Sequence, residues 1–155
     1  MENQDLDFEL ENNRFHVRVA IWLTHNNLVL LQKNKNLSFW NLPGGRAKFG
    51  ENTQEAIKRE LFEELGYESF EEPELICVLE NFFHWMDKNV QEHTFIYKLE
   101  INNCSLINEQ DFLTKDKVDE INHWFNMDEL YKIECKPSVI YSLPNFKNFN
   151  HVIIS

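Results

Sequence analysis

Apolar and polar residues follow strand-like patterns over most of the chain, on both sides of one stretch with helical periodicity. Residues 15–24 (FHVRVAIWLT) form an apolar, β-branched run that predicts a central strand. Residues 25–27 predict a turn, and residues 27–33 are expected to pair back on the strand as a hairpin. The first part of the chain is therefore predicted to be a β-hairpin around a buried strand.

The strand pattern returns after the helical stretch. We predict strands at residues 75–83 and 92–100, joined by a loop over residues 84–91, and a shorter strand at residues 121–125. Residues 106–117 are mostly polar and carry no clear periodicity.

Two short helical segments are expected near the end of the chain. Asn126 can cap a helical turn at residues 127–131, and the apolar run at residues 139–143 predicts a last short helix. Pro137 would pre-set the first turn of that helix and Pro144 would end it. Strands around one helix, with another helix late in the chain, predict an α/β fold with a mixed sheet packed between helices.

The helical stretch begins at Asn52 or Thr53 and ends at Leu65. Ile57, Leu61 and Leu65 recur every four residues and form one apolar stripe, which predicts that the helix docks on the core. Gly66 follows directly, where a helix often takes a left-handed stop. This predicts one amphipathic helix of about four turns in the middle of the chain.

All four glycines lie in this one region, at positions 44, 45, 50 and 66. Glycine serves where the backbone needs a positive φ or a close approach to another group, so the region has unusual backbone demands. Pro43 and the paired Gly44 and Gly45 cannot easily continue a helix or a strand, and we predict a tight turn at residues 42–45.

Composition describes one compact domain. The 155 residues are 43% hydrophobic and 14% aromatic, which excludes a disordered chain and provides for a sizeable core. We expect residues 1–13, which are acidic and rich in asparagine, to form an N-terminal arm or edge strand, and residues 14–155 to form a single domain. The net charge of −11 argues against a basic nucleic-acid groove.

The remaining compositional signals concern location. Cys77, Cys104 and Cys135 are odd in number and form no C-x-x-C pair, so we expect neither a disulfide framework nor a zinc site. The N-terminus has neither a basic segment nor an apolar segment of signal-peptide type, and no apolar run reaches membrane-spanning length. A cytoplasmic protein without a membrane partner is expected.

Three glutamates share one face of the predicted helix. Glu60, Glu63 and Glu64 are spaced at i, i+3 and i+4, where like charges repel by a few tenths of a kcal/mol per pair. A divalent cation would relieve this repulsion, and Mg²⁺ prefers hard carboxylate oxygens. A solvated acidic face is the ordinary alternative for such a cluster.

The complete spacing distinguishes between these readings. Gly45, five residues, Glu51, seven residues and then Arg59-Glu60-Leu61-Phe62-Glu63-Glu64-Leu65-Gly66-Tyr67 resembles the signature box of the Nudix hydrolase family. Only Tyr67 departs, since that family usually has an aliphatic residue there, and we expect the change to affect packing more than chemistry. The resemblance extends to the flanking Trp40-Asn41-Leu42-Pro43. It implies a Nudix-like α/β/α sandwich and a Mg²⁺-dependent pyrophosphohydrolase, with Mn²⁺ as an alternative ion.

The resemblance also implies roles for residues of the box. Glu60, Glu63 and Glu64 would coordinate the metal, with the Gly45 carbonyl as a further ligand, and one of these glutamates or a carboxylate from another loop would act as the base. Glu51 and Arg59 would hold the loop and helix together, with Arg59 orienting carboxylates as a bidentate partner.

Residues outside the box are assigned from their position in the chain and not from a motif. Similar enzymes often take one more acidic residue from a later loop, for which Glu120 is the first choice and Glu92 the second. Phe49, Phe83 and Trp85 are candidates for stacking on a base, although most phenylalanines in such a chain belong to the core.

Two functions of different classes stay open. One is a pyrophosphohydrolase acting on a nucleoside diphosphate linked to another group, and the other is a Nudix-fold nucleotide-binding or sensor module without hydrolysis. The expected partner in both is a small nucleotide or nucleotide derivative, and a homodimer is compatible with either. Isomerase chemistry on an isoprenoid diphosphate, which also occurs on this fold, is disfavoured because no cysteine lies in or next to the box. The fold does not choose among nucleotide substrates.

Overall fold

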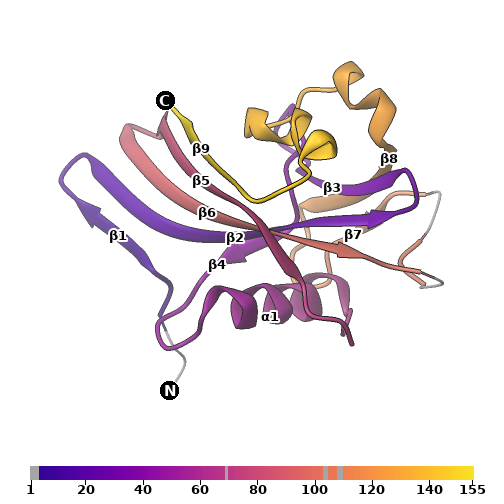
Figure 1. Cartoon of the computed structure of the whole chain (residues 1–155). Coiled ribbons are helices and arrows are strands. Elements are labelled where there is room, and N and C mark those ends of the chain that lie inside the picture. Colours follow the sequence, from indigo (N-terminus) through magenta and orange to yellow (C-terminus); the bar gives the residue numbers. More distant parts are fainter. Residues whose placement is uncertain (1–3, 69, 103–104, 108–109) are drawn as a thin grey trace.

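The protein is built on one mixed β-sheet with a helix against it (Figure 1). The computed structural model describes residues 4–68, 70–102, 105–107 and 110–155. In these residues the sheet has nine strands in the order β7-β8-β3-β2-β6-β5-β9, and β1 and β4 also pair with β2. The strands are β1 (Asp7–Leu10), β2 (Asn13–His25), β3 (Leu28–Asn34), β4 (Gly44–Arg46), β5 (Glu74–Trp85), β6 (Lys88–Glu100), β7 (Phe112–Leu113), β8 (Glu120–Asn126) and β9 (Asn150–Ile154).

Strand β2 is the centre of the sheet, as its apolar run predicts. It pairs in parallel with β6 from Asn13 to Thr24, while β1, β4 and β3 share its other edge one after another. The predicted hairpin with β3 is confirmed, but only Thr24 and His25 of β2 pair with it. Strand β3 then leaves β2 to pair with β8 along its whole length.

The predicted loop at residues 84–91 is wrong. Strands β5 and β6 form one long antiparallel hairpin, whose turn consists of Met86 and Asp87 alone. Both residues have a positive φ, 49° and 63°, which is the backbone geometry that matches the twist of a two-residue hairpin. A Met-Asp pair carries no glycine or asparagine signal, so the sequence pattern concealed this turn.

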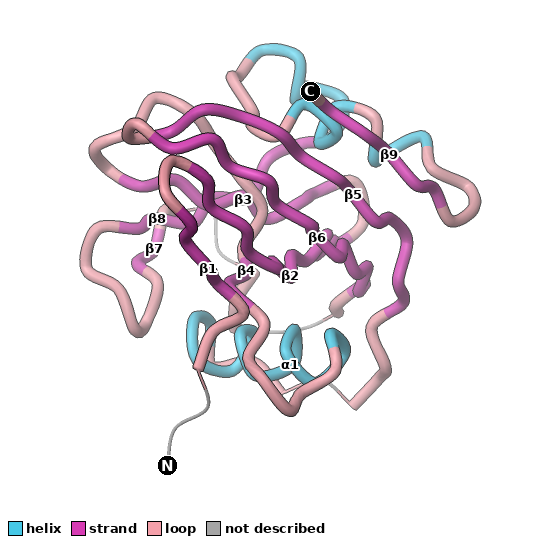
Figure 2. The backbone as a smooth tube through the Cα atoms, turned by 90° about the vertical axis from the view of Figure 1, so that its left-hand side faces the viewer, coloured by secondary structure: helices cyan, strands magenta, loops and turns pink. Residues whose placement is uncertain are grey.

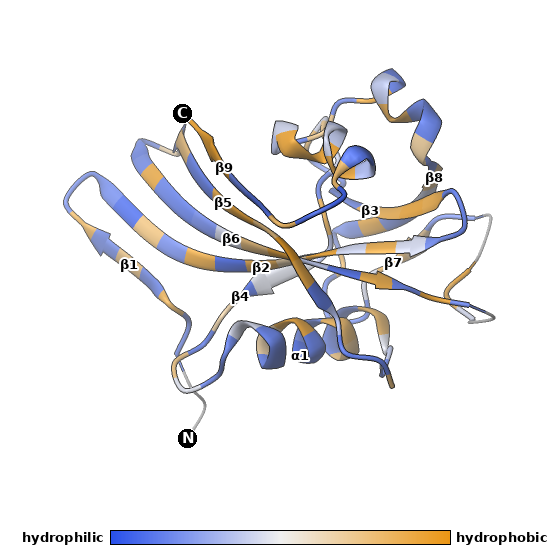
Figure 3. Ribbon diagram, viewed as in Figure 1, coloured by the Kyte–Doolittle hydropathy of each residue, from blue (hydrophilic) through white to orange (hydrophobic). Residues whose placement is uncertain are grey.

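Helix α1 (Thr53–Leu65) covers one face of the sheet, as the tube view in Figure 2 shows. Asn52 caps it: its side chain accepts from the Glu55 amide, and the Glu55 side chain accepts from the Asn52 amide. Gly66 ends the helix with φ 67°, which confirms the predicted left-handed stop. Ile57, Leu61 and Leu65 are buried in the same core cluster as Val19, Ile21 and Leu23 of β2. Figure 3 shows hydrophobic (orange) and hydrophilic (blue) stretches alternating along α1.

Short 3₁₀ segments cover the opposite face. They are η1 (Met127–Lys132), η2 (Ser138–Tyr141) and η3 (Leu143–Asn145), and they pack on a second core cluster. Asn126 caps η1 as predicted, through its side-chain oxygen and the Asp128 amide. The last helix is 3₁₀ and not α, and Pro144 lies inside η3, so the prediction that Pro144 ends a helix is wrong. The layers confirm the α/β class with a mixed sheet between helical segments.

Three local findings complete the fold. Strand β1 pairs antiparallel with β2, and β9, which sequence patterning missed, adds a parallel strand to β5. Cys77 and Cys135 are free, buried thiols, and Cys104 lies outside the described residues. None of the helices in the described residues is long and apolar enough to span a membrane.

Candidate active site

The three glutamates of α1 differ in their environment. Glu60 and Glu64 are buried, with 8% and 1% of their surfaces exposed, whereas Glu63 is exposed. Glu60 and Glu64 lie one turn apart, on the part of the helix that faces β2 and β4. Burial of a carboxylate is costly unless a cation or hydrogen-bond donors surround it. The charge of these two residues therefore has to be compensated by neighbouring groups.

Arg59 provides much of that compensation. Its guanidinium group donates two bonds to Glu51, from Nε at 3.0 Å and from Nη2 at 2.7 Å, which is the bidentate geometry expected of it. Nη1 also donates to Glu60 Oε1 at 2.8 Å and Glu63 Oε2 at 3.1 Å, and Nη2 donates to the carbonyl of Arg46 at 3.0 Å. Arg59 thus joins the helix, the preceding loop and strand β4.

The paired glycines lie in a strand, so the predicted tight turn at residues 42–45 is wrong. Gly44 and Gly45 pair with Ala20 and Val19 of β2. Their lack of a side chain permits close approach: a Cβ on Gly44 would lie 2.0 Å from the Val19 carbonyl oxygen, and one on Gly45 would lie 2.3 Å from Glu60 Oε1. Gly45 therefore needs space for a carboxylate, since its φ is not among the positive values of Gly44, Gly50 and Gly66.

Glu64 belongs to a polar network that sequence reasoning missed. Gln32 of β3 donates from Nε2 to Glu64 Oε2 at 2.9 Å and lies within hydrogen-bond distance of Thr114 and Asn122, all of them buried. The one available signal was a glutamine and an asparagine at inward positions of two otherwise apolar strands. The network holds the Glu64 carboxylate in one orientation.

Lys117 connects Glu64 to Glu120. Its ammonium nitrogen lies 3.3 Å from Glu64 Oε1 and 3.7 Å from Glu120 Oε2. Glu120 stands at the first position of β8, and its buried Oε2 accepts no hydrogen bond from any residue that the structure describes. A single lysine thus bridges Glu120 and the helix carboxylate Glu64. The sequence offered no signal that Lys117 would lie at this site.

The pKa values of the buried glutamates follow from this environment. Burial raises the pKa of Glu64 to about 7, because the charge of Lys117 and the hydrogen bond from Gln32 only partly offset the loss of water. Burial likewise raises the pKa of Glu60 against the opposing effect of Arg59. Both carboxylates are therefore short of positive charge.

A stability prediction follows for Glu64. Its folded pKa of about 7 exceeds its ordinary 4.5, so the metal-free protein is most stable below pH 4.5 with respect to this group and loses that stability as pH rises through 7. The loss should be about 3 kcal/mol above pH 7. Urea unfolding in chelator at pH 5 and pH 8 should show a clearly larger decrease in wild type than in Glu64→Gln, in which Glu60 still contributes through its own raised pKa. An equal decrease in both proteins would contradict the assignment.

The donor set fits a hard divalent cation. It consists of carboxylate oxygens, two of them on buried side chains short of positive charge, together with Oε2 of Glu120, which has no hydrogen-bond donor among the described residues. As the side chains stand, no three acidic, histidine or cysteine side chains in the described part of the chain surround one point. Arg59 and Lys117 pair with the carboxylates instead, so an ion would bind only after the glutamate side chains and Lys117 turn.

A cavity of about 460 Å³ lies on the sheet face opposite α1. Its wall combines Arg18 and Glu92 with aromatic side chains, and it includes Phe83 and Trp85, two of the predicted stacking residues. Arg18 lines the cavity, and its positive charge favours the ionised form of Glu92 and, as a small effect that burial outweighs, of Glu64. Its Nη2 also donates to the carbonyl of Leu42 at 2.8 Å.

Glu92 is held firmly at this cavity. It is buried, 2.6 Å from His16 Nε2, and accepts from the Thr94 hydroxyl at 3.0 Å. Although burial raises the pKa of Glu92, the bond to His16 and the charge of Arg18 more than offset this and lower it. Glu92 therefore presents a negative charge to the cavity. It is not part of the group formed by Lys117, Glu64 and Glu120.

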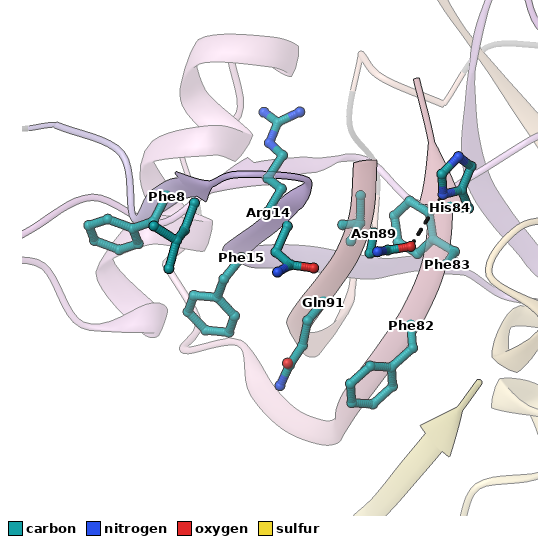
Figure 4. A pocket seen from close by; sticks show the side chains of 11 residues that line it. Phe8, Arg14, Phe15, Phe82, Phe83, His84, Asn89 and Gln91 are labelled. Atoms are coloured by element: carbon teal, nitrogen blue, oxygen red, sulfur yellow. Dashed lines mark hydrogen bonds between the residues drawn. The ribbon is translucent and has the colours of Figure 1, made fainter. Parts of the chain in front are cut away.

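Phe49 lies elsewhere. Its ring packs edge-on against Phe8, with centroids 5.9 Å apart, and it is not among the residues that line the cavity. Phe83 also borders a neighbouring groove between β1, β2, β5 and β6, where Figure 4 shows Phe8, Phe15, Phe82 and Gln91. The three candidate aromatics are thus not gathered at one place.

Sequence comparisons agree with this architecture. Residues 14–145 match the family model described as the NUDIX domain. A putative 8-oxo-dGTP diphosphatase of Bacillus subtilis (strain 168) is 46% identical over 48 residues, 31% of this chain and 32% of that protein. An RNA pyrophosphohydrolase of Blochmanniella pennsylvanica (strain BPEN) is 28% identical over 92 residues, 58% of this chain and 56% of that protein. The chain thus spans about a third and just over half of these relatives.

Solved structures share the fold. A MutT protein from Bacillus halodurans superposes with a TM-score of 0.65 at 21% identity, covering 83% of this chain and 80% of that one. The NUDIX domain of Shewanella oneidensis NrtR, complexed with ADP ribose, has a TM-score of 0.63 at 16% identity over 84% of each chain. At such identities the likeness concerns the fold. Since the family match covers most of the sequence, the chain belongs to the NUDIX domain family.

Proposed function

We propose that this protein is a Mg²⁺-dependent pyrophosphohydrolase that cleaves a diphosphate linkage in a nucleoside diphosphate derivative. The observation that carries the proposal is the pair of buried glutamates, Glu60 and Glu64, which Arg59 and Lys117 only partly neutralise. A helix that served only the fold would gain no stability from two buried carboxylates whose charge is not fully neutralised. Family membership and the names of both relatives agree with such an activity.

The division of labour follows from the geometry. Glu60, Glu63 and Glu64, with the Gly45 carbonyl, would hold the ion, for which Mn²⁺ is the alternative. When bound, the ion would neutralise phosphate oxygens and lower the pKa of a bound water. Glu51 and Arg59 would keep the carboxylates in position, because Arg59 retains its two bonds to Glu51 and its bond to the Arg46 carbonyl when Glu60 and Glu63 turn.

The nucleoside would occupy the cavity beside Arg18. Phe83 and Trp85 offer apolar surface for a base, and Glu92 accepts hydrogen bonds from N–H or O–H groups of the ligand. Arg18 lines this cavity and is its positively charged group nearest in effect to Glu64, so it would bind a phosphate oxygen of the ligand. We assign Glu92 to ligand recognition and Glu120 to the chemistry, because Lys117 forms ion pairs with both Glu64 and Glu120, whereas Glu92 pairs with His16 at the cavity.

Glu120 would be the base for the attacking water, and Glu120→Gln tests this. The change should lower kcat by about 10² to 10⁴ with little change in KM, the range for loss of a general base. If Glu120 is instead a metal ligand, raising Mg²⁺ should restore part of the rate. Glu92→Gln is the matched control and should raise KM more than it lowers kcat. An unchanged kcat in Glu120→Gln would remove Glu120 from the site.

The competing function is a nucleotide-binding module without hydrolysis. The ion pairs that the carboxylates form with Arg59 and Lys117 are the observation in its favour. Product formation across nucleoside triphosphates, dinucleoside polyphosphates, ADP-ribose and nucleotide sugars, with and without Mg²⁺, separates the two. Binding that raises Tm without any product would support the module and contradict the hydrolase.

A further inference from the structure

The hairpin loop between β7 and β8 places a lysine at the metal-ligand face of α1. Thr114 donates its amide to the Glu120 carbonyl at 3.0 Å and closes the loop, and Lys115 donates its amide to the Glu64 carbonyl at 2.8 Å. The loop is thus anchored to the backbone of the residue whose carboxylate Lys117 contacts. This anchoring makes the approach of Lys117 to Glu64 a consequence of the fold.

The two oxygens of Glu64 have different partners. Oε2 accepts from the neutral amide of Gln32 at 2.9 Å inside the buried network, and Oε1 faces the ammonium group of Lys117 at 3.3 Å. An ammonium group and a divalent ion cannot both occupy the position in front of Oε1. Lys117 also lies 3.7 Å from Oε2 of Glu120, an oxygen that accepts no hydrogen bond within the described ranges of the chain.

Arg59 and Lys117 differ in how easily they can leave. Arg59 keeps three bonds to Glu51 and the Arg46 carbonyl whatever Glu60 and Glu63 do. The side chain of Lys117 is 42% exposed, and within the described residues its ammonium group pairs only with Glu64 and Glu120. Lys117 can therefore turn into water on a flexible stem, while Arg59 stays.

We propose that Lys117 is a built-in counter-ion of the metal-free site, which neutralises Glu64 and Glu120 and must withdraw from Glu64 for a divalent ion to bind. The inference rests on the proposed metal dependence and adds a competing cation to it. Each binding event then exchanges one positive group for another at a buried carboxylate. The lysine stabilises the empty site and weakens the affinity for the ion.

Lys117→Met tests the exchange, because methionine keeps an apolar stem of similar length without the charge. In the full chain without nucleotide, calorimetric titration with Mn²⁺ should give an affinity about tenfold tighter than wild type, the expected size for loss of one partly exposed competing charge. The Tm in chelator should fall, and the Tm at saturating Mn²⁺ should change less. Lys117→Gln serves as a second uncharged variant if Lys117→Met does not fold without metal.

Two controls make the result specific. Lys115→Met removes the same charge from an exposed position of the same loop and should leave the Mn²⁺ affinity unchanged. Lys117→Arg keeps the charge and should bind Mn²⁺ no more tightly than wild type. Equal or weaker Mn²⁺ binding by Lys117→Met would overturn the proposed competition between Lys117 and the ion. Weaker binding would mean that Lys117 holds the metal ligands in position. No Mn²⁺ or Mg²⁺ binding by wild type would overturn the proposed metal dependence itself.

Discussion

Glu64→Gln should retain the fold and lose most hydrolysis, by about 10³-fold or more at saturating Mg²⁺. A neutral amide is a poor ligand for the cation, and Glu64 presents a buried oxygen to the position that the ion would occupy. The helix itself should gain from the change, because one of three like charges at i, i+3 and i+4 spacing disappears. Activity and stability therefore move in opposite directions in one variant.

The measurement is steady-state turnover over a range of Mg²⁺ concentrations, beside urea unfolding in chelator at pH 8. Glu63→Gln should also lose most of the activity, but its exposed carboxylate should change stability by less than about 0.5 kcal/mol. Glu68→Gln, an exposed glutamate beyond the helix, controls for the change in net charge and should affect neither quantity. Wild-type turnover in Glu64→Gln at limiting Mg²⁺ would show that α1 is not the metal site.

Alanine at Gly44 and at Gly45 should damage the protein in two different ways. At Gly44 the new Cβ would meet the backbone of β2, 2.0 Å from the Val19 carbonyl oxygen and 2.9 Å from the Ala20 Cα. The central strand would have to move, at a cost of about 3 kcal/mol or more. Gly44→Ala should therefore show a large fall in Tm, with activity lost through unfolding.

At Gly45 the clash is with the end of a flexible side chain, Glu60 Oε1 at 2.3 Å. The carboxylate can turn away, so Tm should change little, but a displaced Glu60 loses its position beside Arg59 and turnover should fall about 10²-fold. Thermal unfolding and kcat measured on both variants check the pair. Full activity in Gly45→Ala would show that activity does not depend on the room that the missing side chain of Gly45 leaves for the Glu60 carboxylate.

The sequence predicted an element correctly where all of the residues that define it lie in one short segment. Asn52, Glu55 and Gly66 mark the ends of α1 through contacts within a few residues, so the helix could be predicted at both ends. The Met86-Asp87 turn was missed because two residues without a turn signal adopt a positive φ there. The pairing of Gly44 in β4 was missed because this glycine is needed for the close approach of strand β2 and not for a turn.

The same limit applies to the candidate site. Spacing along one helix predicts that Glu60 and Glu64 lie one turn apart, but Ile57, Leu61 and the core decide that these two are buried and that Glu63 is exposed. Phe49, Phe83 and Trp85 looked equivalent in the sequence. Only the strand register and the loop before α1 separate Phe49, packed on Phe8, from the two that line the cavity.

The sequence by itself determined the family, the α/β class, the helix with its caps and the carboxylates that the helix carries, because these depend on residues close together in the chain. Only the tertiary structure decided which groups neutralise those carboxylates. Gln32 lies 32 positions before Glu64 and Lys117 lies 53 positions after it, and they meet because β3, β8 and the β7–β8 loop converge on α1. Burial there removes water and makes each charge depend on its neighbours, a property that spacing along the chain does not contain.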